Sequence, residues 1–127
     1  MVSENRVKEI LKTYEEAWVN QDVDKILSIF TEDGTYQERV FKEPFRGHKE
    51  IAEYWKTKVC QEQSKIEFKL LNFYISGNTI IAEWEASFNS NVENTQIHMK
   101  EVTLLEIEND LIKSLREYWQ SEKLPMK

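Results

Sequence analysis

With 127 residues, 40% of them hydrophobic, and a formal net charge of −6, the chain is typical of one soluble globular domain that can bury a core. Its acidic residues are spread along the sequence, which disfavours nucleic acid and anionic membranes as partners. The single cysteine, Cys60, cannot form an internal disulfide and has no metal-ligand spacing around it, so we expect a cytoplasmic protein without a metal or cofactor.

Three helices are predicted in the first half of the chain. The first covers about residues 6–20, where one face is apolar at helical spacing: Val7, Ile10, Leu11, Tyr14, Ala17 and Trp18. Asp22 has the residue type of an N-cap for a second, shorter helix, which we expect to continue to Phe30 and to end at a turn over residues 31–34. A third helix is expected at about residues 48–60, after an irregular segment that ends at Gly47.

Alternation of apolar and polar residues predicts the strands. A short strand is expected over residues 35–39, and a long one begins at Lys65 and runs through Ile75. Residues 76–79, Ser-Gly-Asn-Thr, favour a hairpin turn into a strand over residues 80–89. After a polar loop, residues 97–107 and 111–119 predict a second long hairpin, because Asn109 and Asp110 tolerate the positive φ of a tight turn.

Two faces of the last hairpin place acids among large apolar side chains. Period-two spacing puts Leu111, Leu115, Glu117 and Trp119 on one side of the last strand, and Met99, Glu101, Thr103, Leu105 and Ile107 on one side of the strand before it. The preceding strand puts Ala82, Trp84, Ala86 and Phe88 inside. We interpret these faces as the lining of a cavity whose polar groups are the carboxylates.

The order of elements predicts an α+β fold in a single domain, residues 1–127. A long antiparallel meander cannot leave its apolar face bare, so the curved sheet is expected to wrap around the three helices as a cone with a hollow wide end. Trp18, Trp55, Trp84 and Trp119 all fall on inward faces by these periodicities, as core or as cavity wall.

Several segments resemble the nuclear transport factor 2-like superfamily, with its cystatin-like fold. They are YEEAW at 14–18, FTEDGTY at 30–36, FRGHKEI at 45–51 and LREYW at 115–119. Within that superfamily the chain is most similar to the SnoaL-like polyketide cyclase and ketosteroid isomerase branch, and the resemblance covers nearly the whole chain. It implies the fold and is a poor guide to the reaction, because the superfamily contains both enzymes and binding domains.

The resemblance also implies roles for individual positions. Tyr14 matches the oxyanion-hole tyrosine of the isomerases, Glu38 matches their general base, and Glu117 matches the acid/base residue on the last strand of the cyclases. Their second oxyanion donor, an acid that an apolar site keeps protonated, falls near Thr103, and Glu101 lies two residues earlier on the same face. The arginine that the limonene-epoxide-hydrolase branch places two residues before its aspartate is absent, because Met99 precedes Glu101.

Each of these residues also has a structural alternative. Glu117 either faces inward, where desolvation raises its pKa, or is turned to solvent by a β-bulge. Glu38 is either a base or a surface acid on a short edge strand, and Glu101 is either a site residue or the partner of Lys100 or Arg46. Tyr14 on an apolar helix face is often a core residue.

Two functions are compatible with these residues. In the first, a cofactor-independent enzyme binds a small hydrophobic, carbonyl-bearing molecule and moves a proton with Glu117 or Glu38, while Tyr14 polarises an oxygen. In the second, the same fold is a non-catalytic ligand-binding or dimerisation module. The ligand-binding residues expected in either case are Trp18, Tyr36, Trp55, Trp84, Phe88, Met99, Glu101, Thr103, Leu115 and Trp119.

The outward faces of the meander also predict an assembly. Val102, Leu104, Ile112 and Tyr118 are expected there among charged residues, which makes this face more apolar than a solvated sheet requires. We therefore expect a homodimer packed through the sheet faces, as is common in the superfamily.

Overall fold

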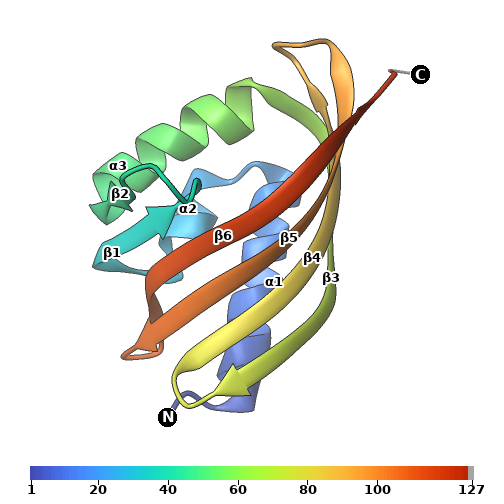
Figure 1. Ribbon diagram of the computed structural model, residues 1–127. Coiled ribbons are helices and arrows are strands. Elements are labelled where there is room, and N and C mark those ends of the chain that lie inside the picture. The colour runs from blue at the N-terminus through green and yellow to red at the C-terminus, as the bar shows by residue number, and fades with distance from the viewer. Residues whose placement is uncertain (126–127) are drawn as a thin grey trace.

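A curved, unclosed six-stranded sheet wraps around helices at its concave face in the computed structural model, which describes residues 1–125 (Figure 1). The strands are β1 (Phe30–Gln37), β2 (Phe45–Arg46), β3 (Gln63–Ser76), β4 (Thr79–Ser90), β5 (Thr95–Glu108) and β6 (Leu111–Leu124). They lie in the order β2-β1-β6-β5-β4-β3. The predicted α+β fold with an antiparallel meander, β3 to β6, is confirmed, and β1 joins it by pairing in parallel with β6.

The helical segments begin where the sequence supplies caps. Helix α1 (Glu4–Asn20) starts at Ser3, whose hydroxyl accepts a hydrogen bond from the Arg6 backbone N–H, and α2 (Val23–Leu27) starts at Asp22, whose carboxylate accepts one from Lys25. Helix α3 (Gly47–Tyr54) continues without a break as the π-helix η1 (Trp55–Gln61). The predicted third helix therefore corresponds to these two segments together.

The second helix is shorter than predicted. It ends at Leu27, and Phe30 already belongs to β1, so residues 31–34 lie within a strand rather than in a turn. The reason is a contact that is distant in sequence: the Ile29 carbonyl accepts a 2.7 Å hydrogen bond from the Ile112 backbone N–H, which begins the pairing of β1 with β6. Local turn chemistry does not reveal such a partner.

Strand β6 contains an extra residue near its beginning. Glu106 of β5 pairs with Ser114, whereas the next residue, Ile107, pairs with Ile112, so that Lys113 has no partner on β5. As a result Ile112 and Leu115 are both fully buried, although strict alternation would put them on opposite faces. The prediction that Ile112 faces outward is therefore wrong, while the predicted inward positions of Leu115 and Glu117 are confirmed.

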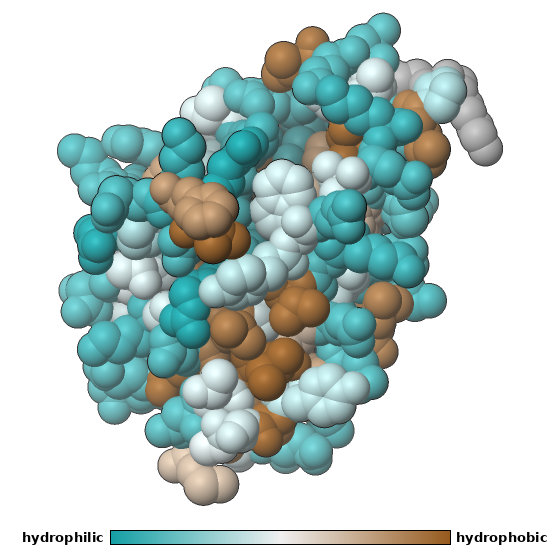
Figure 2. All heavy atoms as spheres, viewed as in Figure 1, coloured by the Kyte–Doolittle hydropathy of each residue, from teal (hydrophilic) through white to brown (hydrophobic). Residues whose placement is uncertain are grey.

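The hydrophobic core lies between the helices and the concave face of the sheet. Trp55 and Trp84 are its largest fully buried side chains, and Trp18 packs beside them with its ring centroid 4.5 Å from that of Trp55. Figure 2 shows apolar side chains gathered on the opposite, convex face of the sheet as well. Within residues 1–125, no helix has the length and apolar character needed to cross a membrane.

Candidate functional site

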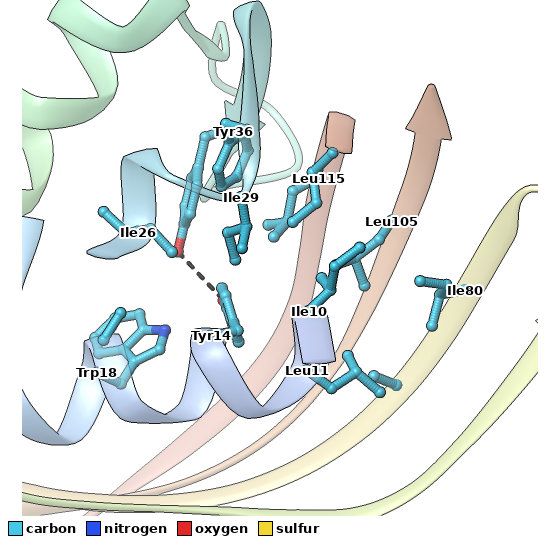
Figure 3. Packing of buried hydrophobic residues seen from close by; sticks show 14 of the residues in the cluster. Ile10, Leu11, Tyr14, Trp18, Ile26, Ile29, Tyr36, Ile80, Leu105 and Leu115 are labelled. Atoms are coloured by element: carbon cyan, nitrogen blue, oxygen red, sulfur yellow. Dashed lines mark hydrogen bonds between the residues drawn. The ribbon is translucent and has the colours of Figure 1, made fainter. Parts of the chain in front are cut away.

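Glu117 is the centre of a buried polar cluster inside the sheet. Its Oε1 atom accepts hydrogen bonds from the hydroxyls of Tyr14, at 3.1 Å, and of Tyr36. The two hydroxyl oxygens also lie 3.4 Å apart, and Figure 3 shows them meeting between α1 and β1. Three elements that are distant in sequence, α1, β1 and β6, therefore converge on one carboxyl group.

Each of the three side chains is placed by the periodicity of its own element. Tyr14 lies on the apolar face of α1, and both it and Tyr36 on β1 are fully buried. Glu117 is 4% exposed, between Leu115 and Trp119 on the inward side of β6. The alternative in which a bulge turns Glu117 to solvent is excluded, because the bulge at Lys113 comes before Leu115 and the alternation is regular after it.

A second carboxyl group, that of Glu101, lies on the neighbouring strand. It is 6% exposed, and its Oε2 atom is buried without a hydrogen-bond partner among residues 1–125. In the register of β5 and β6, Glu117 lies opposite Thr103 and Glu101 lies opposite Trp119, so the two acids are diagonal neighbours on one face. Among the same residues neither Lys100 nor Arg46 pairs with Glu101, and Arg46 contacts Glu43 instead.

Burial favours the protonated form of both carboxyl groups. Desolvation raises the pKa of Glu117 to about 8, and the hydrogen bonds from Tyr36 and Tyr14 only partly oppose this. Burial also raises the pKa of Glu101 well above its ordinary value, and the charge of Glu117 raises it further. Desolvation raises the pKa of Tyr14 and Tyr36 as well, so both remain hydrogen-bond donors.

A pocket of about 260 Å³ lies above these two acids. Its walls are mainly apolar and aromatic, and they include Trp18, Tyr54, Ile66, Phe68, Phe88, Met99 and Trp119, while Glu101 and Glu117 contribute its most deeply buried acidic groups. Charged side chains from η1, β6 and the loop before β5 surround the mouth. Such a site can hold a small molecule with its reacting atoms close to a carboxyl group of raised pKa.

Glu38 and Trp119 separate this pocket from a second one. The Trp119 indole N–H donates a 3.0 Å hydrogen bond to the Glu38 carbonyl oxygen, and the Arg39 guanidinium lies 5.7 Å from the centre of the Trp119 ring. The second pocket, of about 330 Å³, adjoins the loop after β1 and shares Glu38, Arg39, Glu117 and Trp119 with the first. The Glu38 carboxylate itself pairs with Arg39 at 3.1 Å.

The residues expected to bind a ligand fall into two groups. Trp18, Phe88, Met99, Glu101 and Trp119 line the first pocket, together with the candidate acids Glu38 and Glu117. Tyr36, Trp55, Trp84, Thr103 and Leu115 lie in the packed core, where for example the Trp84 indole N–H donates a 3.0 Å hydrogen bond to the Thr103 hydroxyl. Periodicity predicts which side chains point inward. It does not predict which of them line the pocket and which lie in the packed core, because it carries no information on where the sheet separates from the helices.

Several residues of the pocket were not predicted from the sequence. Ile66 and Phe68 lie on the inward face of β3, and Tyr54 and Lys58 project from α3 and η1. The alternation of β3 was a usable signal for the first two, whereas the helix positions depend on how α3 crosses the sheet. Within residues 1–125, no group of three or more His, Cys, Asp or Glu side chains is arranged to hold a metal ion.

Comparison with known families supports this assignment of the fold. The model of the SnoaL-like domain family matches residues 11–115. A search of curated proteins found no match.

Solved structures share the same architecture at low sequence identity. A hypothetical protein with a ketosteroid isomerase-like fold from Catenulispora acidiphila, in complex with trimethylamine, is 21% identical, with a TM-score of 0.77 over 87% of this chain and 84% of that one. The epoxide hydrolase/cyclase-like enzyme SalBIII, described with a role in pyran ring formation in the polyether salinomycin, is 22% identical. Its TM-score is 0.81 over 94% of this chain and 95% of that one.

A third similar structure is an LEH-like epoxide hydrolase of M. tuberculosis. It is 16% identical, with a TM-score of 0.76 over 91% of this chain and 84% of that one. At these identities the likeness shows the fold alone, and the expected nuclear transport factor 2-like, ketosteroid isomerase-like fold is confirmed.

Proposed function

Because the chain belongs to the SnoaL-like domain family, we propose that it is a cofactor-independent enzyme of the isomerase or cyclase type. It holds a small hydrophobic, carbonyl-bearing molecule in the pocket above Glu117 and catalyses a proton transfer. The observation that carries this proposal is the position of Glu117, a buried carboxyl group with a pKa of about 8 beneath an aromatic pocket.

The proton transfer follows from the arrangement of the acids. A carboxyl group that titrates near neutral pH can remove a proton from a carbon next to a carbonyl and return it elsewhere. Glu117, in its ionised form, is the base in this proposal, and the hydroxyls of Tyr14 and Tyr36 stabilise that form by donating to it. Burial raises the pKa of the Glu101 carboxyl well above its ordinary value, and in its protonated form this group donates to the carbonyl oxygen of the ligand.

The position of Tyr14 changes the role that the resemblance implied for it. Its hydroxyl donates to Glu117 rather than pointing freely toward the pocket, and it is absent from the pocket wall. Tyr14 therefore acts as a positioning residue for the carboxyl group. Glu38 lines the pocket, but it pairs with Arg39, which makes it the weaker candidate for the base.

The relatives support a ligand-holding site. SalBIII is described with a role in pyran ring formation, the M. tuberculosis protein is described as an epoxide hydrolase, and the Catenulispora protein was solved with trimethylamine. By analogy the pocket of this chain accepts a molecule of modest size. We also propose a cytoplasmic location, since Cys60 is its lone cysteine and suits a reducing compartment.

Hydrogen–deuterium exchange tests the proposed activity. A panel of small cyclic ketones is incubated with the protein in D₂O, and exchange at the carbon next to the carbonyl is followed by NMR. We expect exchange above the buffer rate for at least one ketone, a loss of at least about 100-fold in Glu117→Gln, and wild-type rates in Glu83→Gln, where an exposed acid of β4 is changed in the same way. Wild-type rates in Glu117→Gln would refute the assignment.

A non-catalytic binding module is the second candidate, and one observation favours it. The Tyr14 and Tyr36 hydroxyls and the Glu117 carboxyl already satisfy one another, as structural polar clusters do. In that case the ketones bind, as shown by calorimetry, but no member of the panel exchanges faster than in buffer.

A further inference from the structure

The cations around the first pocket each have an acid of their own. Among residues 1–125, three basic side chains line this pocket, and all three form ion pairs with acids that line it too. The pairs are Lys58–Glu62 at 3.4 Å, Lys123–Glu93 at 2.8 Å and Arg39–Glu38 at 3.1 Å. These six charges therefore balance one another at the rim of the pocket.

Glu101 and Glu117 also line the pocket, and no basic side chain among residues 1–125 forms an ion pair with either of them. They are only 6% and 4% exposed. The Glu101 Oε2 atom has no hydrogen-bond partner in the same part of the chain. Buried carboxyl groups without a cationic partner are kept in their neutral form, and a cation placed beside these two would be the partner that stabilises an ionised form.

The walls next to these acids suit a particular kind of cation. Aromatic rings line the pocket on several sides, from Trp18 on α1, Tyr54 on α3, Phe68 on β3 and Trp119 on β6. The faces of such rings attract ammonium groups that carry alkyl substituents, because the substituents remove most of the hydration cost. Arg39 already lies over the Trp119 ring, 5.7 Å from its centre, which shows that this ring accepts a cation.

We propose that the ligand of this pocket carries a basic nitrogen, and that a small organic ammonium ion binds between the aromatic walls and the carboxyl groups of Glu101 and Glu117. The inference rests on the proposed function in one respect, since the same pocket holds the ligand. It adds the class of molecule: a carbonyl compound with a substituted amine is preferred over its uncharged counterpart.

Binding of such a cation is coupled to the loss of a proton. Without the ligand, burial favours the protonated forms of both carboxyl groups, and the cation favours the loss of one proton, from Glu117, whose ionised form accepts from Tyr14 and Tyr36. The other charged or titratable groups that face them come from α1, α3, β1 and the loop after it: Tyr14, Tyr54, Tyr36, Glu38 and Arg39. Burial keeps the three tyrosines protonated, so we assign the released proton to Glu117.

Choline and its uncharged carbon analogue, 3,3-dimethylbutan-1-ol, provide a matched pair of probes of the same shape. Isothermal titration calorimetry of the wild-type protein is expected to show choline binding about tenfold or more tighter than the alcohol at pH 8.5. The preference should fall steadily between pH 8.5 and pH 6, whereas the affinity for the alcohol stays nearly constant. Titrations in two buffers of different ionisation enthalpy should show that choline binding releases protons.

Three variants complete the experiment. Glu101→Gln and Glu117→Gln should each reduce the preference for choline by about tenfold, and Glu83→Gln should keep it, because that acid lies on the outward side of β4. Melting curves establish that each variant is folded. If one of the two pocket variants fails to fold, the other still tests the proposal.

The proposal is overturned if the alcohol binds as tightly as choline at pH 8.5, if neither probe binds, or if both pocket variants keep the full preference. These outcomes are distinct from those of ketone exchange. If the protein prefers choline but exchanges no ketone, this inference stands and the proposed enzyme activity is refuted. If it exchanges a ketone but does not prefer choline, the proposed enzyme activity stands and this inference is refuted.

Discussion

A single buried carboxyl group can make the stability of a small protein depend on pH. The Glu117 pKa is raised from 4.5 to about 8, so the folded protein keeps a proton that the unfolded chain releases between those values. Unfolding therefore releases a proton in this window, and the free energy of unfolding must fall as the pH rises from about 5 to 8. The slope is at most about 1.4 kcal/mol per pH unit for one group.

We predict that removal of this group makes the protein less sensitive to pH. The wild-type melting temperature should decrease from pH 5 to pH 8, and Glu117→Gln should decrease less and be more stable than wild type at pH 8, by about 1–3 kcal/mol. The amide keeps an oxygen that accepts from Tyr14 and Tyr36. Thermal unfolding followed by circular dichroism measures both effects. A variant that is clearly less stable than wild type at pH 8 would show that the ionised carboxylate has a structural role.

At the scale of single residues, the sequence predicts which face of the sheet a side chain occupies better than it predicts the contacts that the side chain makes there. The inward position of Glu117 followed from its place between Leu115 and Trp119, and the same alternation located Glu101 and Thr103 on the concave face. The hydrogen bonds from Tyr14 and Tyr36 to Glu117 could not be predicted, because they join residues more than 80 positions apart. The absence of an ion pair for Glu101 among residues 1–125 likewise depends on which cations the fold brings near.

At the scale of elements, the beginning of β1 shows how tertiary contacts override local preferences. Residues 31–34 have the composition of a turn, yet they form part of a strand, whose pairing with β6 is irregular between Phe30 and Thr35. Gly34 lies in this irregular segment. A Cβ atom there would be 3.1 Å from the Ile112 carbonyl oxygen and 3.2 Å from the Phe30 ring.

Gly34→Ala is therefore expected to destabilise the protein by about 1–3 kcal/mol, since the backbone of β6 cannot move without disturbing the core. Chemical denaturation with urea measures this difference. Gly77→Asn is a matched control at the turn between β3 and β4, where nothing lies within 4 Å of the position and the φ of +61° is one that asparagine tolerates. Equal midpoints for Gly34→Ala and wild type would mean that β1 and β6 are not closely packed at this point.

At the scale of the whole molecule, the convex face of the sheet is unusually apolar. The register aligns Tyr74, Ile81 and Leu104 in one row across three strands, and Val102 and Tyr118 lie side by side in the next row. Tyr74 is 55% exposed and Tyr118 is 42% exposed. Figure 2 shows the apolar part of this surface, bordered by polar side chains. Surfaces of this kind are commonly covered by a partner.

We predict that two copies of the chain pack together through these residues as a homodimer with twofold symmetry. Sedimentation velocity at micromolar concentration should show a dimer for the wild type and a monomer for Leu104→Glu, which places a charge at the centre of the apolar row. Val19→Glu, on the exposed side of α1, should remain dimeric. A wild-type protein that sediments only as a monomer would contradict the prediction.

The extra residue Lys113 has a consequence for how this chain can diverge. It has no partner on β5. Deletion of Lys113 would keep the pairs on both sides of it, Ile107 with Ile112 and Glu106 with Ser114, so that β6 would alternate regularly and Glu117 would stay opposite Thr103 on the concave face. The length of β6 can therefore change by one residue at this bulge without moving the acid of the site, and relatives with and without the extra residue can keep the same pocket.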